Sequence, residues 1–291
     1  SVLVQEVQEA LGRLTFAVAV AEELKPFLGP YYAWAASLPR GAYVEVPVLL
    51  RITSRFLAGQ IRERRLQREC FETGEDRSVD AVECFRSDAK AEGDDVGIGG
   101  WECVNGTPPS RARWFYVKVD RRSFPWVYAR GEPYRNIAAL ELLGVLLSWL
   151  SFGDRVSCQA PEVVFSGGGD NKGNSHVVES LSTTKFPLCA VLMELSAQLA
   201  RAGRRMTLRW YPRLQNTEAD DLSNGLTHAF DAKLRVHPDY SAASLLVLPD
   251  LVRYGEELYG EVDARKAAGT TSGVKGPQRP KGDRLKDRDP W

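Results

Sequence analysis

The chain of 291 residues is long enough for one large hydrophobic core or two modest ones. Its 38 Lys and Arg residues balance 38 Asp and Glu residues, so no overall positive charge indicates a nucleic-acid partner, which has to be argued from individual sites. Five scattered cysteines without CxxC spacing, and no recognisable signal peptide, predict reduced thiols in an intracellular protein, cytoplasmic or nuclear, and disfavour a disulfide framework or a zinc site.

The first 70 residues are predicted to be helical. Apolar residues recur at helical spacing over residues 11–24 and 44–61, and Pro26 and Pro39 interrupt the pattern. The charged stretch that follows favours a solvated linker, placed at residues 71–80. The chain begins inside a predicted helix without an initiator Met, which favours a fragment of a longer protein.

Residues 81–230 have the pattern of an α/β unit. Strands are expected at 81–86, 96–104, 114–119, 162–165 and 206–211, and helices at 134–152, 175–182, 187–202 and 218–222. The order β-β-β-α-β-α-α-β-α predicts a mixed five-stranded sheet flanked by helices. The longest apolar run, residues 137–150, is shorter than the about 20 residues that cross a bilayer, so no membrane partner is expected.

The remaining residues divide into a C-terminal extension, 231–260, and a tail, 261–291. The tail has few apolar residues and much Gly, Pro, Lys and Asp, so we expect it to be disordered. It is locally basic, which is typical of a solubilising tail or linker and also permits weak contact with a phosphate backbone.

Four acidic residues stand out from these elements. Glu141 interrupts the middle of an apolar helix, where a carboxylate is costly unless a cation or proton neutralises it, although a solvent-facing position would also explain it. Asp88 falls near the end of the first strand, where it would otherwise be a turn residue. Asp170 follows the fourth strand in a glycine-rich loop, residues 166–174, and Asp220 begins the last short helix, where a helix dipole also favours acids.

These positions can converge on one edge of a mixed sheet. Converging carboxylates repel one another unless cations are present, and hard oxygen ligands select Mg²⁺ or Mn²⁺ over zinc. Two such ions can activate a water molecule and stabilise the leaving oxygen in phosphodiester hydrolysis. The sequence therefore predicts that Asp88, Glu141, Asp170 and Asp220 are both catalytic residues and ligands of two metal ions.

The motifs around these acids resemble a known family. Ser-Asp-Ala-Lys at 87–90, Ala-Leu-Glu-Leu at 139–142, Asp-Asn-Lys-Gly-Asn at 170–174 and Asn-Thr-Glu-Ala-Asp-Asp-Leu-Ser at 216–223 are similar to the acidic series of RNase H domains, in the family's order. The similarity runs over residues 82–225 and is greatest to retroelement reverse transcriptases of the DIRS-like group. Residues 9–16, 25–28 and 31–34 resemble the thumb or connection that follows the polymerase palm.

This resemblance implies an endoribonuclease that cuts the RNA strand of an RNA–DNA hybrid with two Mg²⁺ or Mn²⁺ ions. It also implies a polymerase domain of the reverse transcriptase as partner, because the palm and its own aspartates are absent from this chain. Lys90, Lys172 and Arg213 are candidate contacts to the nucleic acid through its phosphates.

Two departures from the family pattern favour alternatives. Many members have a His a few residues before the last Asp, whereas residues 210–215 contain none, which leaves Arg213 as a substitute. Three glycines, residues 167–169, precede Asp170, and a flexible backbone would hold a metal ligand less firmly. A catalytically inactive connection or nucleic-acid-binding module of a decayed retroelement therefore stays open, as does a nuclease or integrase that acts on DNA.

Overall fold

A computed structural model describes residues 1–62, 83–153 and 164–254, except 20, 37, 40, 129 and 130, together with 257, 258, 260, 261 and 264. The predicted linker, 71–80, lies outside the described residues, as does the predicted tail apart from residues 261 and 264. The proposed division of the chain into five segments stays a prediction.

The N-terminal part is helical, as the sequence predicts, through the end of the described segment. Its elements are α1 (Val4–Ala17), the 3₁₀ helix η1 (Glu22–Leu28), α2 (Gly29–Ala36) and α3 (Val48–Arg62). A two-residue ribbon of β1 (Val2–Leu3) and β2 (Tyr43–Val44) was not predicted, because strands this short have no readable period. Ser196 in the following unit donates a hydrogen bond of 2.7 Å to the carbonyl oxygen of Glu23, and buried residues of both parts form one hydrophobic cluster.

Five strands form a mixed sheet in the order β5-β4-β3-β6-β7, which confirms the predicted α/β class. The strands are β3 (Glu83–Glu92), β4 (Asp95–Glu102), β5 (Trp114–Lys118), β6 (Val164–Gly169) and β7 (Arg205–Trp210). β3, β4 and β5 pair antiparallel, whereas β6 pairs parallel to both β3 and β7. The predicted first strand was too short, so Asp88 lies in the middle of β3 and not near its end.

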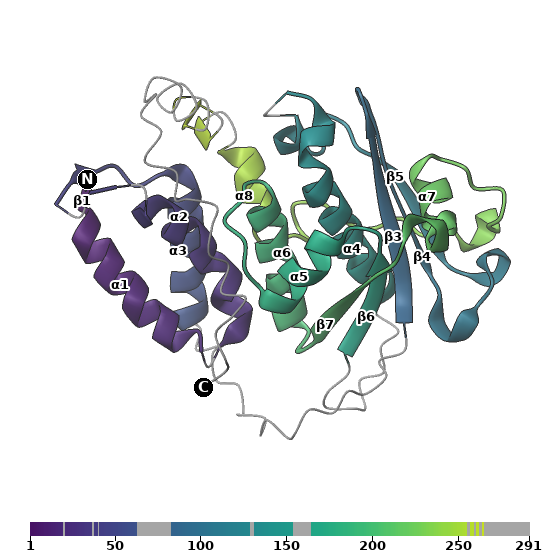
Figure 1. Ribbon diagram of the computed structural model, residues 1–291, viewed down its shortest axis with the longest axis horizontal. Helices are drawn as coiled ribbons and strands as arrows, with labels where there is room; N and C mark the ends of the chain where they lie inside the picture. Colours follow the sequence, from purple (N-terminus) through teal and green to yellow (C-terminus); the bar gives the residue numbers. More distant parts are fainter. Residues whose placement is uncertain are drawn as a thin grey trace, which may run out of the picture.

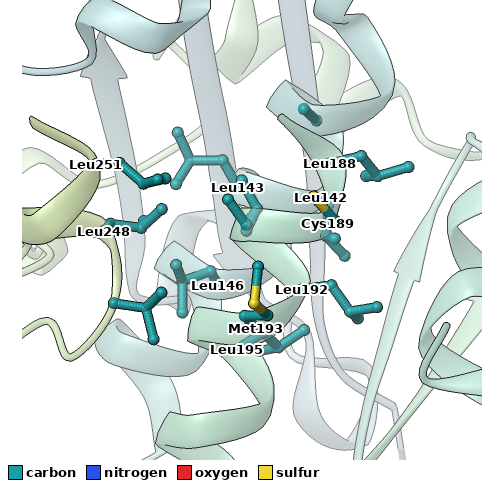
Figure 2. Close-up of a cluster of buried hydrophobic side chains, with 14 of the residues drawn as sticks. Leu142, Leu143, Leu146, Leu188, Cys189, Leu192, Met193, Leu195, Leu248 and Leu251 are labelled. Atoms are coloured by element: carbon teal, nitrogen blue, oxygen red, sulfur yellow. The ribbon is translucent and has the colours of Figure 1, made fainter. Parts of the chain in front are cut away.

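Helices cover both faces of this sheet (Figure 1). One face carries α4 (Ile137–Phe152), α5 (Lys172–Ser180) and α6 (Leu188–Arg201), and the other carries α7 (Thr217–Ser223). The C-terminal α8 (Leu248–Arg253) packs against α6, and Figure 2 shows leucines of α4, α6 and α8 in one buried cluster. The remaining described 3₁₀ helices are η2 (Val104–Gly106), η3 (Pro109–Arg111), η4 (Pro125–Val127), η5 (Pro133–Asn136), η7 (Arg213–Gln215) and η8 (Ala232–Leu234).

Helix α4 is apolar on nearly all sides because it is buried on nearly all sides, between the sheet and α6. Together with η5 it forms a helical segment, Pro133–Phe152, that is long and apolar enough to cross a membrane by length and composition alone. That segment is longer than the apolar run considered in the sequence, but most of it is enclosed by the rest of the protein. Its composition is therefore that of a core helix.

The three glycines before Asp170 belong to β6, so the predicted glycine-rich loop of residues 166–174 was wrong over its first four positions. A Cβ atom on Gly167 would stand 2.0 Å from the ring of Phe85, which is itself fully buried against Phe165. A Cβ atom on Gly168 would stand 2.4 Å from a carboxylate oxygen of Glu83. Glycine here permits close packing, and pairing with β3 and β7 on both sides holds the backbone.

A buried carboxylate holds the C-terminal segment in place. Glu194 of α6 is fully buried and accepts hydrogen bonds from the backbone N–H groups of Leu246, Val247 and Leu248, at 2.6–3.0 Å, and from Gln198. The negative charge lies at the N-terminus of α8, where free N–H groups favour it.

We expect Glu194→Gln to lower the free energy of unfolding by about 1–3 kcal/mol. The carboxylate offers two acceptor oxygens to the backbone N–H groups, whereas the amide offers one oxygen and turns its NH2 group, a donor, toward other donors. Chemical denaturation measures the loss. The control is Glu179→Gln, at an exposed position of α5, which should change the stability little. Equal stability of the two variants would contradict this role of Glu194.

Candidate metal centre

Asp88 is held in the central strand of the sheet. Its side chain is 4% exposed and accepts a hydrogen bond of 2.6 Å from the hydroxyl of Ser223 on α7. Asp88 pairs with Gly99 on the neighbouring strand β4. A Cβ atom on Gly99 would clash with α7, so both positions face that helix. The strand therefore points this carboxylate into the gap between the sheet and α7.

Glu141 reaches the same place from α4. Its side chain is 8% exposed, which rules out the solvent-facing alternative, and the backbone N–H of Ala89 donates a hydrogen bond to its carboxylate. Ala89 directly follows Asp88 in β3. The carboxylate of Glu141 in the apolar helix α4 is thus bound to the backbone directly after Asp88.

Asp170 completes a group of three. The parallel register of β3 and β6 aligns Arg86 with Gly168, so Asp88 lies two residues farther along β3 and Asp170 two residues farther along the chain, directly after β6. One carboxylate oxygen from each of Asp88, Glu141 and Asp170 lies within 4.8 Å of the others. Within the described residues no other group of three or more acids, histidines or cysteines has such spacing, so no cysteine takes part in one.

Asp220 lies near this group but does not belong to it. It sits in α7 with its side chain 28% exposed, and its Oδ1 atom accepts hydrogen bonds from Nε of Arg213, at 3.0 Å, and from Nη2, at 2.5 Å. Its charge nevertheless raises the pKa values of Asp88 and Asp170. The structure therefore brings three of the four predicted ligands together and places the fourth beside them in an ion pair.

Two solved structures that match part of this chain are RNase H domains. RNase H1 from the halophilic archaeon Halobacterium salinarum is 12% identical, with a TM-score of 0.33, and the match covers 49% of this chain and 94% of that one. The N-terminal RNase H domain of a Mycobacterium tuberculosis protein, solved as a fusion with maltose-binding protein, is 20% identical, with a TM-score of 0.34, over 49% of this chain and 96% of that one. No protein-family model and no curated protein matches the sequence. The fold class rests on the strand order and helical cover described above.

The acids of the cluster resist ionisation in the absence of a cation. Burial raises the pKa of Asp88 to about 7, with a further rise from Asp170 and an opposing effect of the Ser223 hydroxyl. Burial, followed by the charges of Asp88 and Asp170, raises the pKa of Glu141 well above its usual value. Burial also raises that of Asp170. A divalent cation offsets both effects, and an all-oxygen donor set fits Mg²⁺ or Mn²⁺.

Three residues support the cluster without having been predicted to do so. Ser223 donates to Asp88, the side-chain amide of Asn216 donates to the carbonyl oxygen of Ser87 at 3.2 Å, and the indole N–H of Trp210 donates to the carbonyl oxygen of Asp170 at 2.9 Å. The sequence held a signal for Asn216 and Ser223, which are the first and last residues of the motif around Asp220. A sequence gives no direct signal for a contact such as that of Trp210.

The three predicted nucleic-acid contacts lie in different surroundings. Lys90 forms ion pairs with Glu92 and Asp95 at the turn between β3 and β4, at 3.2 and 3.1 Å. Lys172, the first residue of α5, lies over the ring of the partly exposed Trp210, with its ammonium 5.7 Å from the ring centre. Arg213 holds Asp220. Lys172 and Arg213 thus flank the carboxylates, whereas Lys90 is engaged by acids at the strand turn.

Proposed function

We propose that this chain is a metal-dependent endoribonuclease that cleaves the RNA strand of RNA–DNA hybrids, as part of a retroelement reverse transcriptase. One observation carries the proposal: Asp88 in β3, Glu141 in α4 and Asp170 directly after β6 direct their carboxylates to within 4.8 Å of one another. Buried acids in such a group need a cation or a proton to offset their charges, and divalent ions held by such acids can drive phosphodiester hydrolysis.

Each residue has a defined task in this proposal. Asp88, Glu141 and Asp170 would hold the ions, with Asp220 at the rim as the fourth ligand. Ions bound there would supply an activated water molecule and stabilise the leaving oxygen. Ser223 fixes the carboxylate of Asp88 through its hydroxyl. Lys172 and Arg213 would contact phosphates of the substrate, which would position it without reading its sequence.

The reverse transcriptase context rests on the sequence resemblance. The four acidic motifs occur in the order of retroelement RNase H domains, and helices α1 to α3 precede the sheet where such proteins have a thumb or connection. The proposed partners are therefore an RNA–DNA hybrid and a polymerase domain elsewhere in the full-length protein.

The deciding experiment offers the purified protein three labelled substrates: an RNA–DNA hybrid, duplex RNA and duplex DNA. With Mg²⁺ or Mn²⁺ we expect cleavage of the RNA in the hybrid alone, and none with chelator or in Asp170→Asn. Preferred cleavage of duplex DNA would favour a DNA nuclease or integrase. Intact substrates with folded protein in both metals would overturn the proposed activity.

The ion pair of Arg213 with Asp220 favours a second candidate, a catalytically inactive module that connects domains or binds nucleic acid. In that case a cation of the chain itself has permanently replaced a metal ion at the fourth carboxylate. Binding of the hybrid without cleavage, and without binding of divalent ions, would support this candidate over the nuclease.

A further inference from the structure

Arg213 and Asp220 form a local unit at the edge of the carboxylate cluster. Arg213 begins η7 and Asp220 lies in α7, so they are separated by little more than one short turn. Both guanidinium contacts go to a single oxygen of Asp220. The arginine side chain is 73% exposed and that of the aspartate 28%, so the guanidinium can leave into solvent while the carboxylate stays at the site.

The charge of Arg213 reaches the whole cluster. It opposes the effect of burial by lowering the pKa values of Asp170, Asp88 and Glu141. An arginine remains protonated at every physiological pH, so this positive charge is permanent. It is therefore a cation built into the chain, set among four acids.

The positions of the acids divide the site into two unequal parts. Asp88, Glu141 and Asp170 already lie close enough together to share an ion, whereas Asp220 is engaged by Arg213. We propose that Arg213 is an internal counter-ion that competes with the second divalent ion for Asp220. The first ion then binds to the three clustered acids, and a second binds only when the guanidinium leaves. This inference rests on the metal centre of the proposed function.

Removal of the competitor should strengthen binding of the second ion. A partly exposed ion pair is a weak interaction, so we expect Arg213→Ala to raise the affinity for that ion about twofold to fivefold. Arg213→Lys keeps the charge and should stay close to the wild type. Asp220→Asn should abolish binding of the second ion and leave the first in place.

The experiment is calorimetric titration of the full chain with Mn²⁺ and with Mg²⁺, without nucleic acid. Arg209→Ala is the matched control, because it removes an exposed positive charge from the end of the neighbouring strand, where the guanidinium lies over Tyr211. The inference requires a higher affinity for the second ion in Arg213→Ala and not in Arg209→Ala.

Two outcomes would overturn the inference: an unchanged or lower affinity for the second ion in Arg213→Ala, or an equal gain in Arg209→Ala, which would indicate a general effect of net charge. The proposed nuclease fails in a different way. If the wild type binds no ion and leaves hybrids intact, the metal centre itself is wrong; if it binds ions and cleaves hybrids, only the role of Arg213 is at issue.

Discussion

Asp88→Asn should make the metal-free protein more stable at pH 8 while lowering Mg²⁺-dependent cleavage of a hybrid by about a thousandfold or more. The amide keeps the size of the carboxyl group and can still accept the hydrogen bond from Ser223. It removes a negative charge that is buried beside Glu141 and Asp170. The same substitution therefore removes charge repulsion from the folded state and removes one ligand of the metal ions.

The gain in stability follows from the raised pKa. Below pH 3.8 the carboxyl is protonated in both the folded and the unfolded chain, so its ionisation causes no difference in stability between wild type and variant. Between pH 3.8 and about 7 the unfolded chain loses the proton first, and the wild type loses stability as the pH rises. At about 1.4 kcal/mol per pKa unit, the advantage of the variant has an upper limit of about 4 kcal/mol above pH 7.

Chemical denaturation at pH 4 and pH 8, with chelator and with Mg²⁺, measures this prediction. Mg²⁺ should stabilise the wild type more than Asp88→Asn, because only the wild type offers the complete set of ligands. Asp94→Asn, at an exposed turn, removes a carboxylate of the same kind and should change neither stability nor cleavage appreciably. A variant that is less stable than the wild type at pH 8 in chelator would refute the electrostatic account of this cluster.

Gly99→Ala should destabilise the fold and impair the site together. The new Cβ atom would stand 2.4 Å from Cβ of Leu222 and 2.5 Å from the backbone nitrogen of Ser223, so α7 has to move away from the sheet. Overpacking of this kind costs about 1–3 kcal/mol. Because α7 carries Asp220 and the hydroxyl that holds Asp88, we expect cleavage to fall by about a hundredfold.

The matched control is the same substitution at Gly59 in α3, where a Cβ atom meets nothing within 4 Å. There alanine should be neutral or stabilise the helix by up to about 1 kcal/mol. Thermal unfolding and cleavage rates of the two variants give the comparison. Full stability and full activity of Gly99→Ala would show that the contact between α7 and β4 is not tight.

The sequence predicted the elements whose periodicity or composition is strong. The apolar run of α4 and the short strand-like segments around it predicted the correct α/β class, and Glu141 stood out because an acid interrupted that run. β3 was predicted too short because Ser87, Asp88 and Lys90 are polar residues in a strand that is paired on both sides. Tertiary contacts, which no local pattern encodes, stabilise such a strand.

β6 was misjudged for a related reason. Glycines usually mark loops, but Gly167 and Gly168 are in a strand because the side chains of Phe85 and Glu83 fill the space of their Cβ atoms. At the site, the residue types and their order predicted four acids, of which Asp88, Glu141 and Asp170 gather. The ion pair of Arg213 with Asp220 could not be predicted, because it depends on how η7 and α7 turn beside the sheet.

The central position of β3 bears on how the protein matures during synthesis. Asp88 is translated before the residues that surround it, since Asp170 and Ser223 follow about 80 and 135 positions later. A nascent chain that has not yet released α7 from the ribosome lacks the fourth acid and the hydroxyl that orients the first. Nuclease competence would thus arise only after the messenger has been read through the region that encodes α7.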